Sequence, residues 1–323
     1  MAVERRRRRR VRRYLKGVPF LPSLLTLGNA FCGFLAIVKV TDAARLAGEG
    51  AVPQAAVELV EAAGLLILLA MVFDGLDGKV ARLTDQTSRF GAELDSLADV
   101  VTFGIAPAVI AKFLITVHHA PSRGAVGAAH QLLPYHPRIY YVCAAVYALF
   151  AVLRLARFNV EVTDTDESAH EEFEGLPSPA AAAFVTSLIL FWCAEGERNS
   201  LSRIFFTEGV YDAVIIALPG VLLGCGLLMV SRFPYPHVMN RLLRGRKTFP
   251  SLVAAVIILI LGVLEWQIVL LALNGLYLIT GPVLGTARFA RALVTGRGND
   301  DDDVDSGEPP PGVVEGPGAR SLP

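Results

Sequence analysis

The sequence predicts an all-α protein, a polytopic integral membrane bundle of about eight transmembrane helices. Of its 323 residues, 53% are hydrophobic and only 19% are charged, and the mean hydropathy is +0.50. The charged residues gather in short blocks between long apolar runs. A helix needs about 20 apolar residues to cross a bilayer, so each long run is a candidate span. This pattern is typical of a membrane protein and not of soluble domains.

Eight apolar runs are candidate spans. The seventh is short, and it can form a tight hairpin with the eighth. The runs cover residues 20–40, 54–74, 95–117, 139–158, 177–194, 209–231, 250–265 and 267–286.

The positions of Lys and Arg predict the orientation, because cytoplasmic loops are rich in these residues. One basic block lies within residues 1–19, a second within 232–249, and a third follows the eighth span. Eight spans place all three blocks on one side, so we expect a protein of the cytoplasmic membrane with both termini in the cytoplasm. The first block is either a topology signal alone or also a site for anionic lipid headgroups. We expect membrane lipids and no nucleic acid as partners.

We predict four segments along the chain. The last is rich in Asp, Pro and Gly, a composition that cannot form a core. The segments are a basic cytoplasmic N-terminal segment (1–19), a membrane core (20–240), two additional C-terminal transmembrane helices (241–290) and a disordered acidic cytoplasmic tail (291–323).

Four aspartates lie where apolar runs meet polar sequence. Asp74 and Asp77 are three residues apart, and Asp95 and Asp99 are four apart, so each pair shares a helix face. The connection is short, so the two helices are antiparallel neighbours whose acidic faces can meet. A carboxylate inside a bilayer costs a few kcal/mol unless a partner offsets it. Two divalent cations balance four carboxylates, and oxygen-only ligands favour Mg²⁺ or Mn²⁺.

Neighbouring residues fit a phosphate-binding role. Gly78 lacks side-chain bulk, so a phosphate can come close. Arg82 follows four residues later and can reach the same face, where its fork suits a phosphate oxygen. Two metal ions about 3.5–4 Å apart clamp a transferring phosphoryl group in many enzymes. Alternatively, the four aspartates are ordinary helix-end charges that water solvates at the membrane surface. This alternative does not explain the regular spacing of the aspartates, glycines and arginine in the segment.

Residues 74–99 resemble the signature of the CDP-alcohol phosphatidyltransferase family, with no departure at any fixed position. The matching residues are Asp74, Asp77, Gly78, Ala81, Arg82, Gly91, Asp95 and Asp99. The resemblance implies an enzyme that moves a phosphatidyl-type group from a CDP-linked lipid to an alcohol and releases CMP. It also implies that the four aspartates bind two divalent cations, that Asp99 is the general base, that the other signature residues contact the CDP-lipid, and that the protein forms a homodimer.

Three further stretches resemble the membrane-integral phosphatidylserine synthases within that family. The first is residues 22–29, where Ser23 replaces the usual Asn. The second is residues 154–159 with 173–179, and the third is residues 230–236. The resemblance covers about residues 18–240. It implies CDP-diacylglycerol as donor and L-serine as acceptor.

A physical argument for serine adds to this resemblance. The serine carboxylate needs a cation, which Arg154 or Arg157 can supply, with Asn159 nearby. The alternative for both arginines is positive-inside anchoring. For Thr26 and Asn29, nucleotide contact and interhelical hydrogen bonding are both open.

Two rival functions remain. A sister enzyme would use glycerol 3-phosphate or an inositol phosphate as acceptor. A divalent-cation transporter would instead place carboxylates near the membrane midplane, often on broken helices in paired repeats. The aspartates cluster at one interface and no repeat is visible, so the sequence favours phosphatidyl transfer to serine.

Overall fold

The computed structural model describes residues 20–47, 53–84, 88–118, 137–164, 172–194, 208–236, 256 and 259–295. The predicted segment 1–19, half of the predicted seventh span and nearly all of the predicted acidic tail lie outside these residues. Contacts divide the chain into residues 1–284 and 285–323. The description below concerns the first of these units. In the second, residues 285–295 continue the last helix.

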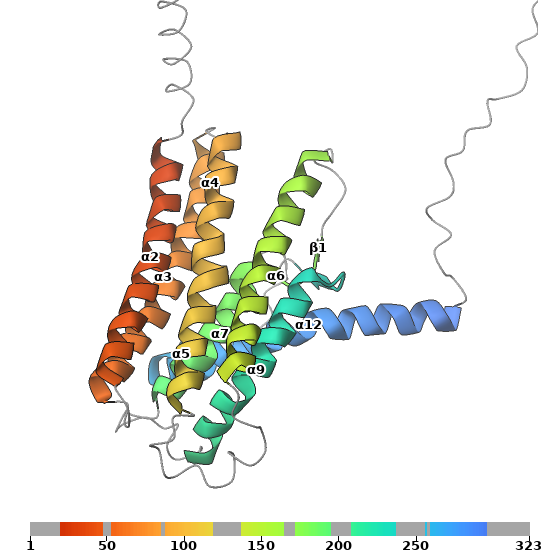
Figure 1. Cartoon of the computed structure of the whole chain (residues 1–323). Coiled ribbons are helices and arrows are strands. Elements are labelled where there is room, and N and C mark those ends of the chain that lie inside the picture. The colour runs from red at the N-terminus through yellow and green to blue at the C-terminus, as the bar shows by residue number, and fades with distance from the viewer. Residues whose placement is uncertain are drawn as a thin grey trace, which may run out of the picture. The chain divides into compact units, whose positions relative to one another are not determined.

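Six helices among the described residues are long and apolar enough to cross a membrane. Five of them are α2 (Phe20–Ala47), α3 (Gln54–Leu83), α6 (Pro137–Asp164), α9 (Glu208–Val230) and α12 (Trp266–Thr295). The sixth, the third along the chain, is one continuous helix made of α4 (Arg89–Asp99), η1 (Val100–Ile105) and α5 (Ala106–His118). A shorter apolar helix, α7 (Ser178–Cys193), lies at the predicted fifth span, residues 177–194. The structure confirms the all-α bundle, and the chain is a multi-pass membrane protein (Figure 1).

The helices run beyond the predicted spans. Helix α2 ends at Ala47 and not at residue 40, and α3 ends at Leu83 and not at residue 74. The third long helix begins at Arg89, six residues before the predicted start. An apolar run marks the part of a helix that lipid covers, whereas backbone hydrogen bonding continues into polar surroundings. Both pairs of aspartates therefore lie inside helices, where their geometry is fixed.

Helices α2 and α3 pack side by side along much of their length (Figure 1). Small buried residues line this contact, among them Ala36 and Ala43 of α2 and Ala56 and Ala63 of α3. Small side chains let helix backbones approach closely in a membrane. Helix α2 also contacts α4 and α5, so the first three long helices form one group.

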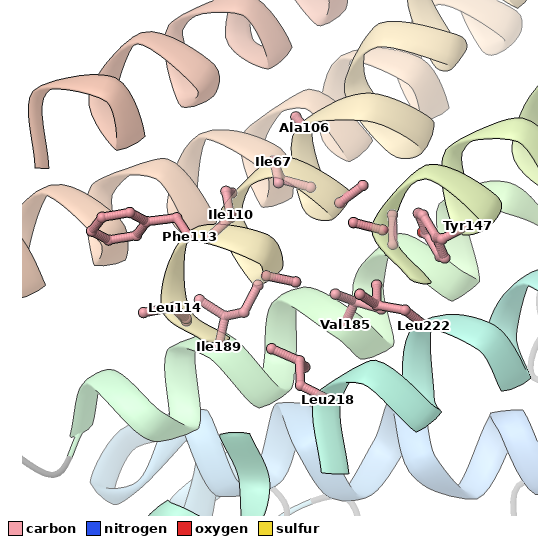
Figure 2. Close-up of a cluster of buried hydrophobic side chains, with 14 of the residues drawn as sticks. Ile67, Ala106, Ile110, Phe113, Leu114, Tyr147, Val185, Ile189, Leu218 and Leu222 are labelled. Carbon is pink, nitrogen blue, oxygen red and sulfur yellow. The ribbon is translucent and has the colours of Figure 1, made fainter. Parts of the chain in front are cut away.

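The core lies where α3, α5, α6, α7 and α9 meet. Ile67, Ile110, Tyr147, Val185 and Leu218 come from these five helices, and all are buried. Figure 2 shows these side chains gathered between the helices. The third long helix is therefore held by neighbours on several sides, which fixes the residues that precede η1.

A two-stranded antiparallel sheet joins distant parts of the chain. Strand β1 (Glu172–Glu174) pairs with β2 (Pro234–Pro236), with Phe173 opposite Tyr235. Residues 234–236 contain two prolines, Pro234 and Pro236, yet they form a strand. Proline favours extended backbone, and the turn at Gly175 brings the two segments together. Gly175 has φ 82°, and a Cβ there would lie 2.6 Å from the Met229 carbonyl oxygen, so only glycine fits.

Tyr235 connects this sheet to α12. Its side chain is fully buried, and its hydroxyl donates to the Leu278 carbonyl oxygen at 3.1 Å. Its ring lies 5.6 Å from that of Tyr277, centroid to centroid. Burial raises the pKa of the Tyr235 hydroxyl, so it remains a protonated donor. The C-terminal helix is thus attached to the core near the sheet.

Candidate functional site

The acidic face of α4 is set by the way the helix begins. Ser88 has extended backbone, and its Oγ accepts a hydrogen bond from the Gly91 N–H at 3.0 Å. This is an N-cap, which satisfies one of the free N–H groups at a helix start. From this start Gly91, Asp95 and Asp99 follow at intervals of four and lie on one face. Ser88 was missed at the sequence level, although a serine before a helical pattern is a start signal.

Three aspartates from two helices form a compact cluster. Asp74 of α3 and Asp95 and Asp99 of α4 each bring a carboxylate oxygen within 4.8 Å of the others. Asp99 is buried, and the other two are partly buried. Three like charges this close are unfavourable unless a cation or a proton neutralises them. The predicted meeting of the two acidic faces is therefore present.

Asp77, the fourth predicted ligand, is buried beside this cluster. Its Oδ2 accepts a hydrogen bond from the Thr26 hydroxyl of α2 at 2.8 Å. Asp77 and Asp95 both line the pocket described below. The Thr26 bond fixes the Asp77 side chain and leaves its second oxygen for another partner.

Asn29 holds Asp99 in a similar way. The Asn29 Nδ2 donates to Asp99 Oδ1 at 3.1 Å, and Asn29 is fully buried. Thr26 and Asn29 are three residues apart on α2, so they reach neighbouring aspartates from one face. Of the two alternatives for these residues, interhelical hydrogen bonding is present. Contact with a nucleotide remains a proposal.

A pocket of about 200 Å³ opens beside the aspartates, between the start of α2, the end of α3 and the start of α4. It contains four of the predicted contact residues, Thr26, Gly78, Ala81 and Gly91. A Cβ at Gly78 would meet nothing within 4 Å, so this wall has free space in front of it. The full lining is Pro22, Ser23, Thr26, Asp77, Gly78, Ala81, Ser88, Gly91, Ala92 and Asp95.

The residues of the cluster fit a divalent cation. Asp95 Oδ1 is buried and has no hydrogen-bond partner in the described part of the chain. A buried carboxylate oxygen without a donor is unfavourable unless a cation meets it. The ligands are all oxygens, which suits Mg²⁺ or Mn²⁺.

Arg82 is placed away from this pocket. Its side chain is exposed, and its Nε donates to the Gly78 carbonyl oxygen one turn earlier, at 3.1 Å. It is absent from the pocket lining. The predicted contact between Arg82 and a phosphate therefore requires another side-chain conformation.

The three acceptor candidates on α6 differ in their surroundings. Arg154 donates from Nη1 to Ser178 Oγ at 2.7 Å, and its charge interacts with that of Asp99. Its Nε is buried and has no hydrogen-bond partner among the described residues. Asn159 Oδ1 accepts from the Ser96 hydroxyl at 3.0 Å. Arg157 is half-buried. Arg154 is thus a partly buried cation whose charge acts on Asp99, and Ser178 at the start of α7 is its hydrogen-bond partner.

Comparisons with known proteins give relatives that share one name, CDP-diacylglycerol–serine O-phosphatidyltransferase. A Helicobacter pylori protein is 35% identical over 172 residues, 53% of this chain and 59% of that protein. A Mycobacterium tuberculosis protein is 36% identical over 203 residues, 62% of this chain and 59% of that protein. A Saccharomyces cerevisiae protein is 33% identical over 220 residues, 66% of this chain and 69% of that protein.

The chain thus spans about three fifths of the length of the first relatives it matches. The sequence model of the CDP-alcohol phosphatidyltransferase family matches residues 19–223, which include α2, α3, α4 and the whole acidic cluster. This match covers more than half of the chain. The protein therefore belongs to the CDP-alcohol phosphatidyltransferase family.

Proposed function

We propose that the protein transfers the phosphatidyl group of CDP-diacylglycerol to the hydroxyl of L-serine, giving phosphatidylserine and CMP. The observation that carries this proposal is the three-carboxylate cluster at the edge of a pocket. The names of the relatives support serine as the acceptor.

Asp74, Asp77, Asp95 and Asp99 would hold two divalent cations, Mg²⁺ or Mn²⁺. When bound, such ions supply positive charge that stabilises the phosphoryl oxygens and the departing CMP. The four carboxylates balance the charge of two such ions.

Asp99 acts as general base in this proposal. The serine oxygen attacks the phosphorus that carries diacylglycerol, and the bond from that phosphorus to the CMP oxygen breaks. The proton of the serine hydroxyl moves to an Asp99 oxygen. The Asn29 amide already occupies Oδ1 of Asp99, so Oδ2 is the oxygen left to accept the proton.

The pocket beside the cluster would hold the CDP part of the donor. Gly78, Ala81 and Gly91 leave room for it, and Thr26 lies at its wall. Arg82 would turn from the Gly78 carbonyl toward a phosphate oxygen, because a guanidinium binds a phosphate more strongly than a peptide carbonyl. The acyl chains would extend sideways into the bilayer.

Arg154 would bind the carboxylate of serine. Its buried Nε needs an acceptor, and a carboxylate can bond two guanidinium N–H groups at once. Arg157 and Asn159 are further acceptor contacts in this proposal. The proposal places the active site toward the cytoplasm in the inner membrane, where CDP and serine are supplied, and includes a homodimer as the oligomeric form.

Purified protein in lipid nanodiscs, supplied with labelled CDP-diacylglycerol and one acceptor at a time, tests this function. We expect CMP release with L-serine and not with glycerol 3-phosphate or an inositol phosphate. CMP release with glycerol 3-phosphate and not with serine would show that glycerol 3-phosphate is the acceptor. Mn²⁺ uptake into sealed vesicles without CMP release would favour a transporter and contradict the proposed reaction.

A further inference from the structure

A π-helical turn follows Asp99 directly. In η1 the helix widens, and the Ala106 N–H bonds to the Val101 carbonyl oxygen, five residues back. Such turns are rare and are often found at functional sites. A widened turn changes the rotation between the residues before it and those after it. The acidic face of α4 can therefore point toward α2 and α3 while α5 packs into the core.

Helix α2 holds both Asp99 and the π-helical turn. The Thr102 hydroxyl donates to the Asn29 carbonyl oxygen at 3.1 Å, while the Asn29 side chain donates to Asp99. One turn further along α2, a Cβ at Gly33 would lie 2.5 Å from Thr102 Oγ1 and 2.8 Å from Thr102 Cα. The backbone of α2 thus meets the π-helical turn directly, and Asn29 links that turn to Asp99.

Helix α6 holds the opposite side of the same turn. The Tyr147 hydroxyl donates to the Phe103 carbonyl oxygen at 3.0 Å, and both residues are fully buried. Figure 2 shows the Tyr147 ring reaching from α6 into the core. A widened turn disturbs the regular hydrogen bonding of a helix, so an outside donor to one of its carbonyl groups stabilises it.

These bonds set the register between α6 and the third long helix. The helices are tied at two levels, by Ser96 with Asn159 and by Phe103 with Tyr147. On the third long helix, Asp99 lies between Ser96 and Phe103. On α6, Arg154 lies between Tyr147 and Asn159. Arg154 is also two turns from Tyr147, on the same face of α6. The two bonds therefore bracket Asp99 on one helix and Arg154 on the other, and place them at similar levels along the helix pair.

We propose that Thr102 and Tyr147 are positioning residues, whose hydroxyl groups fix the π-helical turn and thereby hold Asp99 opposite Arg154. The roles given to Asp99 and Arg154 rest on the proposed function. Neither hydroxyl lies in the pocket lining, so both act through the helix. The metal-binding face of α3 is held separately, by the bond from Thr26 to Asp77.

The test uses Tyr147→Phe and Thr102→Val, which remove one hydroxyl each. Small displacements of reacting groups lower rates strongly, so we expect kcat/KM for serine to fall about 10- to 100-fold. The affinity for Mn²⁺, measured by electron paramagnetic resonance, should fall by a smaller factor than kcat/KM, because only one of the four proposed ligands, Asp99, depends on this turn, and Asp77 keeps its own bond from Thr26. Thr102→Ser restores a hydroxyl and should restore activity. Tyr140→Phe is the matched control, since Tyr140 is a buried tyrosine seven residues before Tyr147 on α6.

Hydrogen exchange of the peptides that cover residues 89–105 gives a readout without any acceptor. With Mn²⁺ and CDP present, exchange should be faster in Tyr147→Phe and Thr102→Val and unchanged in Tyr140→Phe. Unchanged exchange in the first two variants would overturn the inference, and so would an equal loss of serine turnover and Mn²⁺ affinity. If the wild-type protein releases no CMP with serine, the proposed acceptor is wrong. The hydrogen-exchange result then tests the positioning role of Thr102 and Tyr147 by itself.

Discussion

Asp99 has surroundings that none of the other three aspartates shares. It is buried, it accepts a hydrogen bond from Asn29, and its charge interacts with that of Arg154. An amide in its place keeps the size of the side chain but cannot accept the proton of the acceptor hydroxyl.

We therefore predict that Asp99→Asn lowers CMP release by roughly 10²- to 10⁴-fold, the usual contribution of a general base. Metal-dependent binding of CDP, measured by calorimetry, should be largely retained, because the Asp99 charge is shared with Asn29 and Arg154 and acts only in part on the cations. Turnover at the wild-type rate in the presence of Mg²⁺ would contradict the role of Asp99.

Asp74 belongs to the same cluster but has no described hydrogen bond from a neighbouring side chain. We predict that Asp74→Asn weakens both Mn²⁺ binding and CMP release, since its charge acts mainly on the cations. Glu93→Gln is the matched control, because Glu93 is an exposed carboxylate on the same stretch of chain. An equal effect of both substitutions would show that general surface charge, and not the cluster, matters.

At the level of secondary structure, the contact between α2 and η1 holds the helix turn that follows Asp99. A methyl group at Gly33 would meet the backbone and the side chain of Thr102. We predict that Gly33→Ala destabilises the protein by roughly 1–3 kcal/mol, as overpacking usually does, and also lowers activity.

The midpoint of thermal unfolding in detergent measures this effect. Gly224→Ala in α9 is the control, because a Cβ there meets nothing within 4 Å. Since alanine favours a helix over glycine, this control should keep or raise the midpoint. A lower midpoint for Gly224→Ala than for Gly33→Ala would contradict the close packing of α2 on η1.

Some elements were predictable from the sequence and others were not. Apolar runs identified the long helices, and the spacing of the aspartates predicted their shared faces. The helix ends extended beyond the runs because hydropathy reports lipid contact and not hydrogen bonding. The π-helical turn at 100–105 has no composition signal, since it depends on contacts with Asn29 and Tyr147, which are distant in sequence. For the same reason, the pairing of β1 with β2 was not predicted.

At the scale of the whole molecule, α12 lies beyond the residues that the family model matches, yet it contacts the core. The Tyr235 ring packs against the Gly281 backbone, where a Cβ would overlap the ring. Through its contacts with Tyr235, α12 supports the sheet. This sheet lies beside Ser178, the hydrogen-bond partner of Arg154.

We predict that Gly281→Ala lowers the midpoint of thermal unfolding, because the Tyr235 ring must move and its bond to Leu278 is strained. Gly262→Ala, where a Cβ meets nothing within 4 Å, should leave the midpoint close to that of the wild type. Equal midpoints for the two variants would mean that α12 does not pack on Tyr235.

In the proposed reaction, the acidic cluster holds divalent cations for phosphatidyl transfer to serine. Serine-dependent CMP release by the purified protein, first with a chelator and then with added metal, tests this role most directly. We expect no release with the chelator and recovery when Mg²⁺ or Mn²⁺ is restored. Serine-dependent release that continues at the full rate in the chelator would contradict the proposed role of the cluster.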